Sequence, residues 1–297
     1  MIKKSVLSLF ILSALCFSQH FAIEIQFHGG SKYVFWNSEQ EDDKFGDISI
    51  PMASDYQAAG VKVDDSAKYN TEYVLISDNA NGFYIVWSES QNPNQYLYAM
   101  HFDSTGTPLW SDPIQINNVP TEKSGLTAVV NGAGDLIVAW NDDIISIDGI
   151  YVEILNTSLE LVFGGLGFAI SNEGTSKTHP ILVSGDNTDA YVVWGEERGG
   201  FDGVYIQRIK NTGLVMFEAN GLAITNYTSD ASGISVCKDG LGGIMAVWLD
   251  NRAGYLDIYG QQIDGNGNYY WGSNGSIIVS IGEPGLGLPL KILSNES

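Results

Sequence analysis

The sequence predicts an all-β fold, a β-propeller of five four-stranded antiparallel blades, and three observations lead to this prediction. Tryptophan recurs at nearly constant spacing, 51, 53, 54 and 54 residues apart, at Trp36, Trp87, Trp140, Trp194 and Trp248. Each repeat reads as short strands joined by Gly-rich and Asp-rich turns, and no convincing helical spacing follows the first 22 residues. Self-similarity at such a period is the signature of a repeat fold, and blades of four strands are typical of propellers.

The fourth repeat shows the four expected strands most clearly. Its second strand is apolar throughout, as expected of a strand covered on both faces, and its third alternates apolar and polar residues, as a half-buried strand does. The expected strands are Pro180–Val183, Ala190–Trp194, Gly203–Ile209 and Leu222–Ile224.

The N-terminal 22 residues do not share the repeat and are expected to be a secretory signal peptide. Lys3 and Lys4 precede an apolar stretch from Val6 to Phe17, and Ala22 offers a cleavage point. This order of charge, apolar core and small residues is that of an export signal, and the core is short for a membrane span of about 20 residues. Leu15 before Cys16 departs from the pattern of a lipoprotein signal.

The remaining chain is expected to be one propeller domain, residues 23–297. The repeats are placed at about 23–72, 73–124, 125–178, 179–232 and 233–287, with an extra strand at 288–293. Both termini then offer a first strand. We therefore favour five blades, and keep six blades, an incomplete ring or a shortened relative of a longer propeller as alternatives.

Net charge limits which partners the protein can bind, and the cysteine count decides whether it can form a disulfide. The formal net charge is −21, which disfavours nucleic acid and anionic membranes. The acidity favours solubility, and attraction of cations such as Ca2+ is the alternative; no other cofactor is expected. Removal of the signal leaves Cys237 alone, so no internal disulfide is possible. We expect Cys237 to be a small buried apolar residue.

The fifth repeat resembles a repeat of secreted bacterial propeller proteins, V-W-x-D-x-R-x-G-x-x-D-I-Y-x-Q-x-I-D-x-x-G-x-x-x-W. The fourth repeat keeps part of this pattern but has Lys210 where the turn Asp belongs. The resemblance implies a secreted, periplasmic or cell-surface propeller and no particular activity. The turn from Asp103 to Trp110 is distantly similar to the Asp-box of sialidases and to quinoprotein blades, both structural hairpin devices. The matching residues of the fifth repeat are Val247, Trp248, Asp250, Arg252, Gly254, Asp257, Ile258, Tyr259, Gln261, Ile263, Asp264, Gly267 and Trp271.

An acidic residue follows each blade tryptophan by two positions and is the strongest candidate for a binding site. Loops on one rim of a propeller converge, so these carboxylates and the arginines beside them could bind a cation or a sugar. Repetition in every blade favours instead a hydrogen-bond network that fixes each turn. The candidate residues are Glu89, Asp142, Glu196 and Asp250, with Arg198 and Arg252.

No catalytic or metal-binding motif is recognisable. The histidines His28, His101 and His179 fall in different repeats, and each is expected to be a single surface or rim residue. A glycosidase would need two facing carboxylates, hence residues that break the repeat. The acids that do so lie in no motif; they are Glu41, Asp42, Asp43, Asp64, Asp65 and Glu122.

We therefore expect a secreted or cell-envelope, monomeric propeller that binds carbohydrate or protein without catalysis. Rim loops rich in Asp, Asn, Tyr and Trp suit such recognition. The alternatives are a propeller-fold glycoside hydrolase and a truncated fragment of a larger surface protein. Acids unique to one or two blades and lining the central cavity would favour the enzyme.

Overall fold

The computed structural model describes residues 69–91, 94–142, 148–228 and 232–280, together with the backbone of three strands nearer the N-terminus. These three strands are β1 (Ala22–His28), β2 (Ser31–Asn37) and β3 (Gly60–Asp64), which form one antiparallel sheet in the order β1-β2-β3. They belong to a first compact unit, residues 1–69, and the remaining strands form a second. The expected signal peptide up to residue 21, the acids Glu41 to Asp43 and the extra strand at 288–293 lie outside the described residues.

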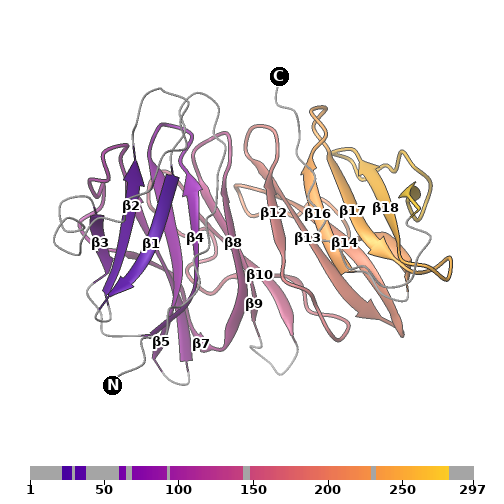
Figure 1. Cartoon of the computed structure of the whole chain (residues 1–297), viewed down its shortest axis with the longest axis horizontal. Coiled ribbons are helices and arrows are strands. Elements are labelled where there is room, and N and C mark those ends of the chain that lie inside the picture. The colour runs from indigo at the N-terminus through magenta and orange to yellow at the C-terminus, as the bar shows by residue number, and fades with distance from the viewer. Residues whose placement is uncertain are drawn as a thin grey trace, which may run out of the picture. The chain divides into compact units, whose positions relative to one another are not determined.

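The second unit is a succession of four-stranded antiparallel sheets, one for each of repeats two to five, and the described residues contain no helix (Figure 1). We call them the second to fifth blades. The second contains β4 (Tyr69–Ser77), β5 (Phe83–Gln91), β6 (Asn94–Phe102) and β7 (Ile114–Thr121), and the third β8 (Lys123–Val130), β9 (Leu136–Asp142), β10 (Gly149–Leu155) and β11 (Phe168–Ser171). The fourth contains β12 (Ile181–Ser184), β13 (Asp189–Arg198), β14 (Phe201–Lys210) and β15 (Leu222–Thr228), and the fifth β16 (Ser232–Lys238), β17 (Ile244–Asp250), β18 (Asp257–Ile263) and β19 (Ser276–Val279).

The all-β propeller fold and its antiparallel four-stranded blades are thus confirmed. The number of complete blades differs from the expected five. Four of the described sheets have four strands, and the described strands of the first repeat form a sheet of three; residues 38–59 of that repeat are not described.

Chain order sets strand order within each blade, because every connection is a hairpin between neighbours. In the fourth blade Trp194 pairs with Tyr205, and Val193 pairs with Ile181 on its other side. Aspartate shapes several of the turns. The Asp78 carboxylate accepts the backbone N–H groups of Ala80 and Gly82, both at 2.7 Å, which is the Asx geometry that favours Asp in tight turns.

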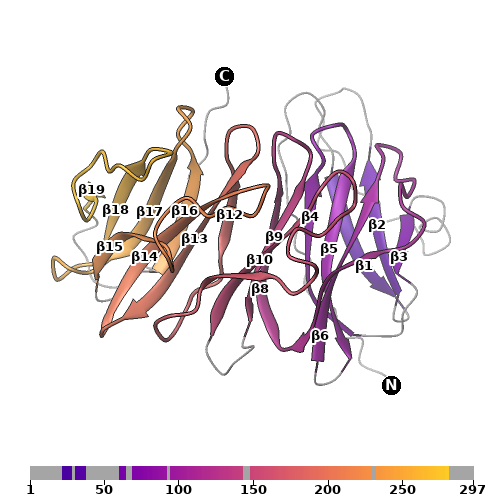
Figure 2. The same ribbon diagram turned by 180° about the vertical axis from the view of Figure 1, so that it is seen from behind.

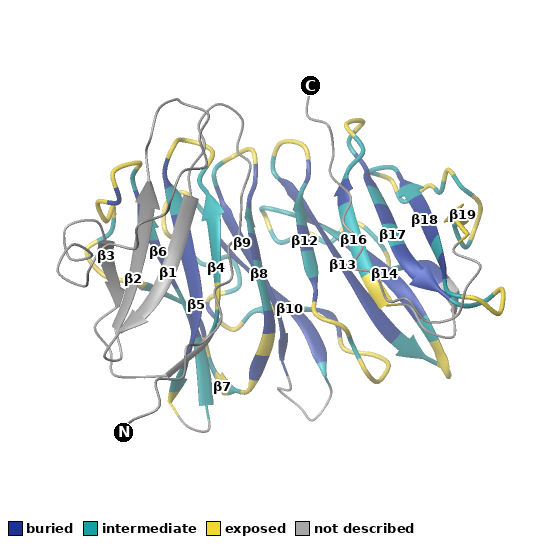
Figure 3. Ribbon diagram, viewed as in Figure 1, coloured by how far each residue is buried: buried dark blue, intermediate teal, exposed yellow. Residues whose placement is uncertain are grey.

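The core lies between successive blades, and the middle strands carry most of it, as the dark blue ribbons in Figure 3 show. Trp140 belongs to the apolar cluster shared by the second and third blades, Trp194 to that of the third and fourth, and Trp248 to that of the fourth and fifth. The aromatic residue expected after the third strand packs on these clusters as Trp110, Phe163 and Phe217. Each blade therefore covers the face of the next.

The first strands of neighbouring blades also lie against one another, β8 beside β12 and β12 beside β16. Figure 2 shows the same four sheets from behind. Cys237 on β16 is a buried free thiol, as expected from the sequence.

Candidate functional site

The acidic residue two positions after the blade tryptophan is buried where the second strand ends. The indole Nε1–H of the tryptophan donates a hydrogen bond to this carboxylate in three blades. The donor–acceptor distances are 2.9 Å for Trp140 to Asp142, 2.7 Å for Trp194 to Glu196 and 3.1 Å for Trp248 to Asp250.

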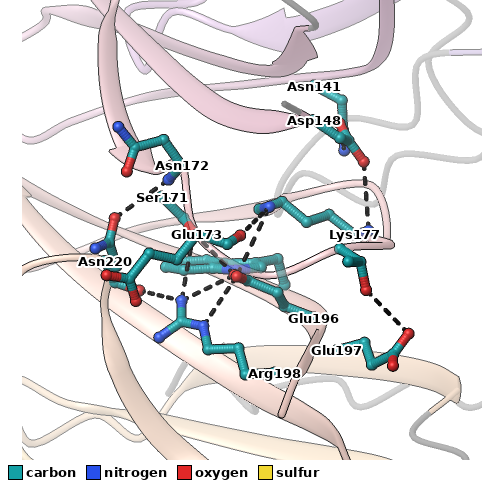
Figure 4. Close-up of polar contacts among 12 residues, drawn as sticks. Asn141, Asp148, Ser171, Asn172, Glu173, Lys177, Glu196, Glu197, Arg198 and Asn220 are labelled. Carbon is teal, nitrogen blue, oxygen red and sulfur yellow. Dashed lines mark hydrogen bonds and ion pairs between the residues drawn. The ribbon is translucent and has the colours of Figure 1, made fainter. Parts of the chain in front are cut away.

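In the fourth blade an arginine completes the arrangement, and the network reaches the preceding blade. Arg198 donates from Nε to Glu196 Oε1 at 2.9 Å and from Nη2 to Glu196 Oε2 at 2.9 Å. Ser171, on the outer strand of the third blade, donates its hydroxyl to the same Oε2 at 2.8 Å. Figure 4 shows Glu196 between Ser171, Arg198 and Lys177. The cluster joins two blades as well as fixing one turn.

The fifth blade repeats this geometry. Arg252 donates from Nε to Asp250 at 2.8 Å, and its Nη2 also contacts Asp250. The same Nη2 donates to the hydroxyl of Thr225, on the outer strand of the fourth blade, at 3.1 Å. A hydroxyl of one blade is thus held by the ion pair of the next.

The third blade has no arginine at this position, and a lysine from its first strand replaces it. Lys123 Nζ lies 3.3 Å from Asp142 Oδ2 and donates to the Val119 carbonyl at 2.7 Å and to the Thr121 hydroxyl at 2.8 Å. Burial lowers the pKa of Lys123, and the charge of Asp142 opposes this shift.

The structure therefore places the predicted residues in separate sheets and brings together only neighbours in sequence, Glu196 with Arg198 and Asp250 with Arg252. Glu89, in the second blade, accepts a hydrogen bond from Gln91 Nε2 at 3.0 Å. All four predicted carboxylates are buried, none more than 5% exposed. A shared binding ring of these residues stays a prediction.

A cleft of about 260 Å³ lies elsewhere on the same edge, between the starts of the first strands of the fourth and fifth blades. The lining residues come from the segment that leads into β12 and from β16. They are Thr178, His179, Pro180, Ile181, Gly233 and Ile234. The wall is built locally, because Thr178 accepts a hydrogen bond from the Gly195 N–H at 2.7 Å and donates its own N–H to the Gly195 carbonyl at 2.8 Å.

His179 is exposed in this cleft and also closes the gap to the third blade. A Cβ atom added to Gly125 of β8 would lie 2.7 Å from both Cβ and Cγ of His179. Gly125 has a φ of 65°, in the left-handed region that suits glycine. Glycine at position 125 therefore allows both the kink in the first strand and the close packing against His179.

Glu72, on β4 of the second blade, contacts Gly125 from the other side. Its carboxylate accepts the backbone N–H of Gly125 at 3.1 Å and that of Leu126 at 2.7 Å. These bonds hold the bulge in β8, where the register shifts between Ser124 and Thr127. Carboxylate oxygens can accept more than one hydrogen bond each, so the half-buried Glu72 retains acceptor capacity.

Sequence reasoning missed this pair as a site, although a signal was present. Glu72, Gly125, His179 and Gly233 all stand fifteen residues before their blade tryptophan. Two blades have glycine there and two have an ionisable side chain, so this position breaks the repeat. Of the acids expected to break the repeat, Glu122 is exposed and does not line the cleft, and the side chains of the others are not among those that the structure describes.

The described segments hold no group of three or more His, Cys, Asp or Glu side chains placed to bind a metal ion. Binding of Ca2+ stays a prediction. None of the described residues belongs to a helix long and apolar enough to cross a membrane.

No protein-family model and no curated protein matches the chain. Its fold is similar to several solved structures at low identity. A Hadza microbial sialidase is 14% identical with a TM-score of 0.43, over 80% of this chain and 51% of that one, so the chain spans about half the length of the sialidase. A PL25 ulvan lyase is 12% identical with a TM-score of 0.47, over 88% and 71%. An α-L-arabinofuranosidase from Podospora anserina is 10% identical with a TM-score of 0.35, over 70% and 66%.

These similarities correct one expectation. The solved structures are enzymes that act on carbohydrates, glycosidases and a polysaccharide lyase. The expectation of a non-catalytic binding module was therefore wrong. It rested on the composition of the rim loops and on the lack of a recognisable catalytic motif in the sequence.

Proposed function

We propose that this chain is a glycoside hydrolase of the propeller fold, with its active site at the cleft between β12 and β16. One observation carries the proposal. Glu72 and His179 break the repeat at the position where Gly125 and Gly233 follow it. His179 lines the cleft, and Glu72, on the first strand of the second blade, bonds to Gly125, which packs against His179. A structural device recurs in every blade, whereas a reaction centre needs its groups once.

The two side chains suit the proton transfers of glycosidic hydrolysis. Water adds to the anomeric carbon as the bond from that carbon to the glycosidic oxygen breaks, one proton leaves the water, and one reaches the departing oxygen. Imidazole and carboxyl groups are the usual general acids and bases in enzymes, so the imidazole of His179 would take the place of the second carboxylate that a glycosidase ordinarily uses. His179 is exposed to a substrate in the cleft, and the two amides that hold Glu72 fix its orientation.

The test is product formation by residues 23–297, the chain without its expected signal peptide. It would be incubated with a panel of polysaccharides, and new reducing ends and short oligosaccharides would be measured. We expect release from at least one polymer, with a loss of about 100-fold or more for His179→Ala and for Glu72→Gln, the range that general acid–base groups contribute.

Glu160→Gln is the matched control, because Glu160 is an exposed glutamate on the hairpin after β10, at the opposite edge of the blade. It should retain wild-type turnover. Melting temperatures of all variants would separate loss of chemistry from loss of fold. Full turnover by His179→Ala, or no product from any polymer, would refute the proposal.

A further inference from the structure

Two exposed aromatic side chains stand at equivalent positions on neighbouring hairpins. Phe201 follows Trp194 by seven residues, and Tyr255 follows Trp248 by the same number. They are 59% and 52% exposed. Phe201 opens β14 directly after Gly199 and Gly200, whose φ values of 62° and 84° make the tight turn. A large aromatic side chain at a hairpin tip contributes little to a core, and the equivalent positions of the second and third blades hold Asn94 and Ile147. The aromatic pair is therefore specific to these two blades, which favours a ligand-binding role over a structural one.

Both tips lie on the edge of the blades that contains the cleft. The segment before β12 runs beside the end of β13, with Thr175 N–H bonded to the Glu197 carbonyl at 3.0 Å and Glu197 N–H to the Ser176 carbonyl at 3.1 Å. In the fifth blade Ser232, at the start of β16, pairs with Leu249 near the end of β17. A chain lying along this edge would therefore meet the cleft and both aromatic tips.

The lysine and arginine side chains of this edge all lie against buried carboxylates. Arg198 and Lys177 lie against Glu196, as Figure 4 shows. Arg252 is paired with Asp250, and Lys123 with Asp142. The other basic residues between 70 and 280 are Arg208, which is paired with Asp189, and Lys210 and Lys238, which end β14 and β16 at the opposite edge.

Apart from the imidazole of His179 in the cleft, the exposed ionisable side chains that remain on this edge are acidic. Glu122 lies in the connection between β7 and β8, and Glu173 in the segment that leads to the cleft; both are exposed. The whole chain has a net charge of −21. A surface of one sign repels ligands of that sign, so a polymer of uronate or sulfated sugars would meet repulsion and find no unpaired lysine or arginine among the described residues of this edge.

We infer that this edge binds an uncharged polysaccharide chain, with Phe201 and Tyr255 as stacking platforms on the fourth and fifth blades. The apolar face of an uncharged pyranose or furanose ring covers an aromatic ring without burying a charge. The inference rests on the proposed function, which supplies the polysaccharide as substrate. It adds that this polysaccharide is uncharged and that Phe201 and Tyr255 bind it outside the cleft.

The test is binding, measured apart from turnover. The chain from residue 23 to 297 would be run in native gels that contain arabinoxylan, a mixed-linkage β-glucan, polygalacturonate or a sulfated galactan, and retardation would give dissociation constants. We expect at least one neutral polymer to retard the protein and neither polyanion to do so at low salt. The double variant Phe201→Ala/Tyr255→Ala should weaken retention about tenfold or more, as loss of aromatic anchors does.

Leu241→Ala is the control, because Leu241 is 81% exposed in the turn between β16 and β17 on the opposite edge. It should bind as the wild type does. Equal or tighter binding of polygalacturonate, unchanged binding by the double variant, or no retardation by either neutral polymer would each overturn the inference. Retention that depends on the two aromatic residues, without product release, would leave the inference standing and reject the proposed hydrolysis.

Discussion

The third and fourth blades make the same contact between a strand and the following hairpin, one through a glutamate carboxylate and the other through a glutamine amide. In the fourth blade Gln207 Oε1 accepts the N–H groups of Arg208 and Phe217, both at 2.9 Å, and its Nε2 donates to the Glu218 carbonyl at 3.0 Å. The third blade has Glu153 at the equivalent position. Its Oε1 accepts the N–H groups of Ile154 and Phe163, both at 2.9 Å, which reproduces the first half of the pattern.

The remaining hydrogen bond has donor and acceptor exchanged, because one peptide group of the third blade is flipped relative to the fourth. Glu153 Oε2 accepts the N–H of Gly165 at 2.9 Å, and that N–H belongs to the same peptide as the carbonyl of Gly164, the equivalent of Glu218. The peptide has turned over to present a donor to a carboxylate. Gly164 and Gly165 have φ values of 67° and 81°, which only glycine adopts readily. The two glycines allow the peptide to flip, and the flipped peptide gives the buried carboxylate of Glu153 a hydrogen-bond donor.

In these two blades the geometry of the contact is the same although the charge of the side chain differs. Glu153 and Gln207 are both almost fully buried, but only the carboxyl group titrates. Burial raises the pKa of Glu153, and the backbone amides of Phe163, Ile154 and Gly165 oppose the shift. The third blade is therefore sensitive to pH at a point where the fourth is not.

The largest effect is expected from the ion pair that both the fourth and fifth blades use. Arg252→Ala would leave the Asp250 carboxylate, which is 0% exposed, buried with the indole N–H of Trp248 and without its cation. Removing one partner of a buried pair destabilises a protein by about 3–5 kcal/mol. Urea denaturation would measure the loss. Arg252→Ala/Asp250→Asn should be less destabilised than Arg252→Ala, and an equal or greater loss in the double variant would contradict this account.

Gln207→Glu transfers the carboxyl group of the third blade to the fourth without its glycine pair. The new oxygen would face the Glu218 carbonyl, so an N–H donor is lost and two acceptors meet. An unsatisfied buried polar group costs about 1–3 kcal/mol, and the loss should be greater at pH 8 than at pH 5, where protonation restores a donor. Adding Glu218→Gly and Ala219→Gly should recover stability by allowing the peptide to turn. If Gln207→Glu without the two glycine substitutions were as stable as the wild type at pH 8, the comparison would be wrong.

Glu153→Gln tests the same contact in the opposite direction, with a smaller expected effect. Because the folded-state pKa of Glu153 is raised, its contribution to stability is fully present below the unfolded pKa and is lost as the pH rises through the folded value. The variant should therefore gain stability relative to the wild type between acidic and neutral pH, within the ~0.5–3 kcal/mol typical of point substitutions. Denaturation at pH 4 and pH 7.5 measures the difference, and a difference that does not change with pH would contradict the assignment.

Phe201→Ala should have the smallest effect on stability. Its ring is exposed at a hairpin tip, and exposed substitutions usually change the free energy of unfolding by less than about 0.5 kcal/mol. Thermal unfolding followed by circular dichroism would measure it. A clear drop in melting temperature would assign Phe201 a packing role and weaken its assignment to a ligand.

Most of the scaffold could be predicted from the sequence because it depends on local pattern. The strands of the fourth repeat expected at Ala190–Trp194 and Gly203–Ile209 lie within β13 and β14. The role of Lys123 could not be predicted, because it comes from another strand, nineteen residues before Asp142. The same holds for Glu72 and Gly125, whose contact joins two blades. Such pairings follow from how blades pack, which no spacing within a repeat specifies.

The contacts of Ser171 and Thr225 also bear on how the chain is made. Each hydroxyl lies on the last strand of its blade. Each is hydrogen-bonded to a side chain of the next blade, which is synthesised later, Ser171 to Glu196 and Thr225 to Arg252. The fourth and the fifth blade can therefore each pack on a strand that has already been synthesised. Because stability in repeat proteins is shared between neighbours, we expect these two contacts to form in the order in which the blades are made.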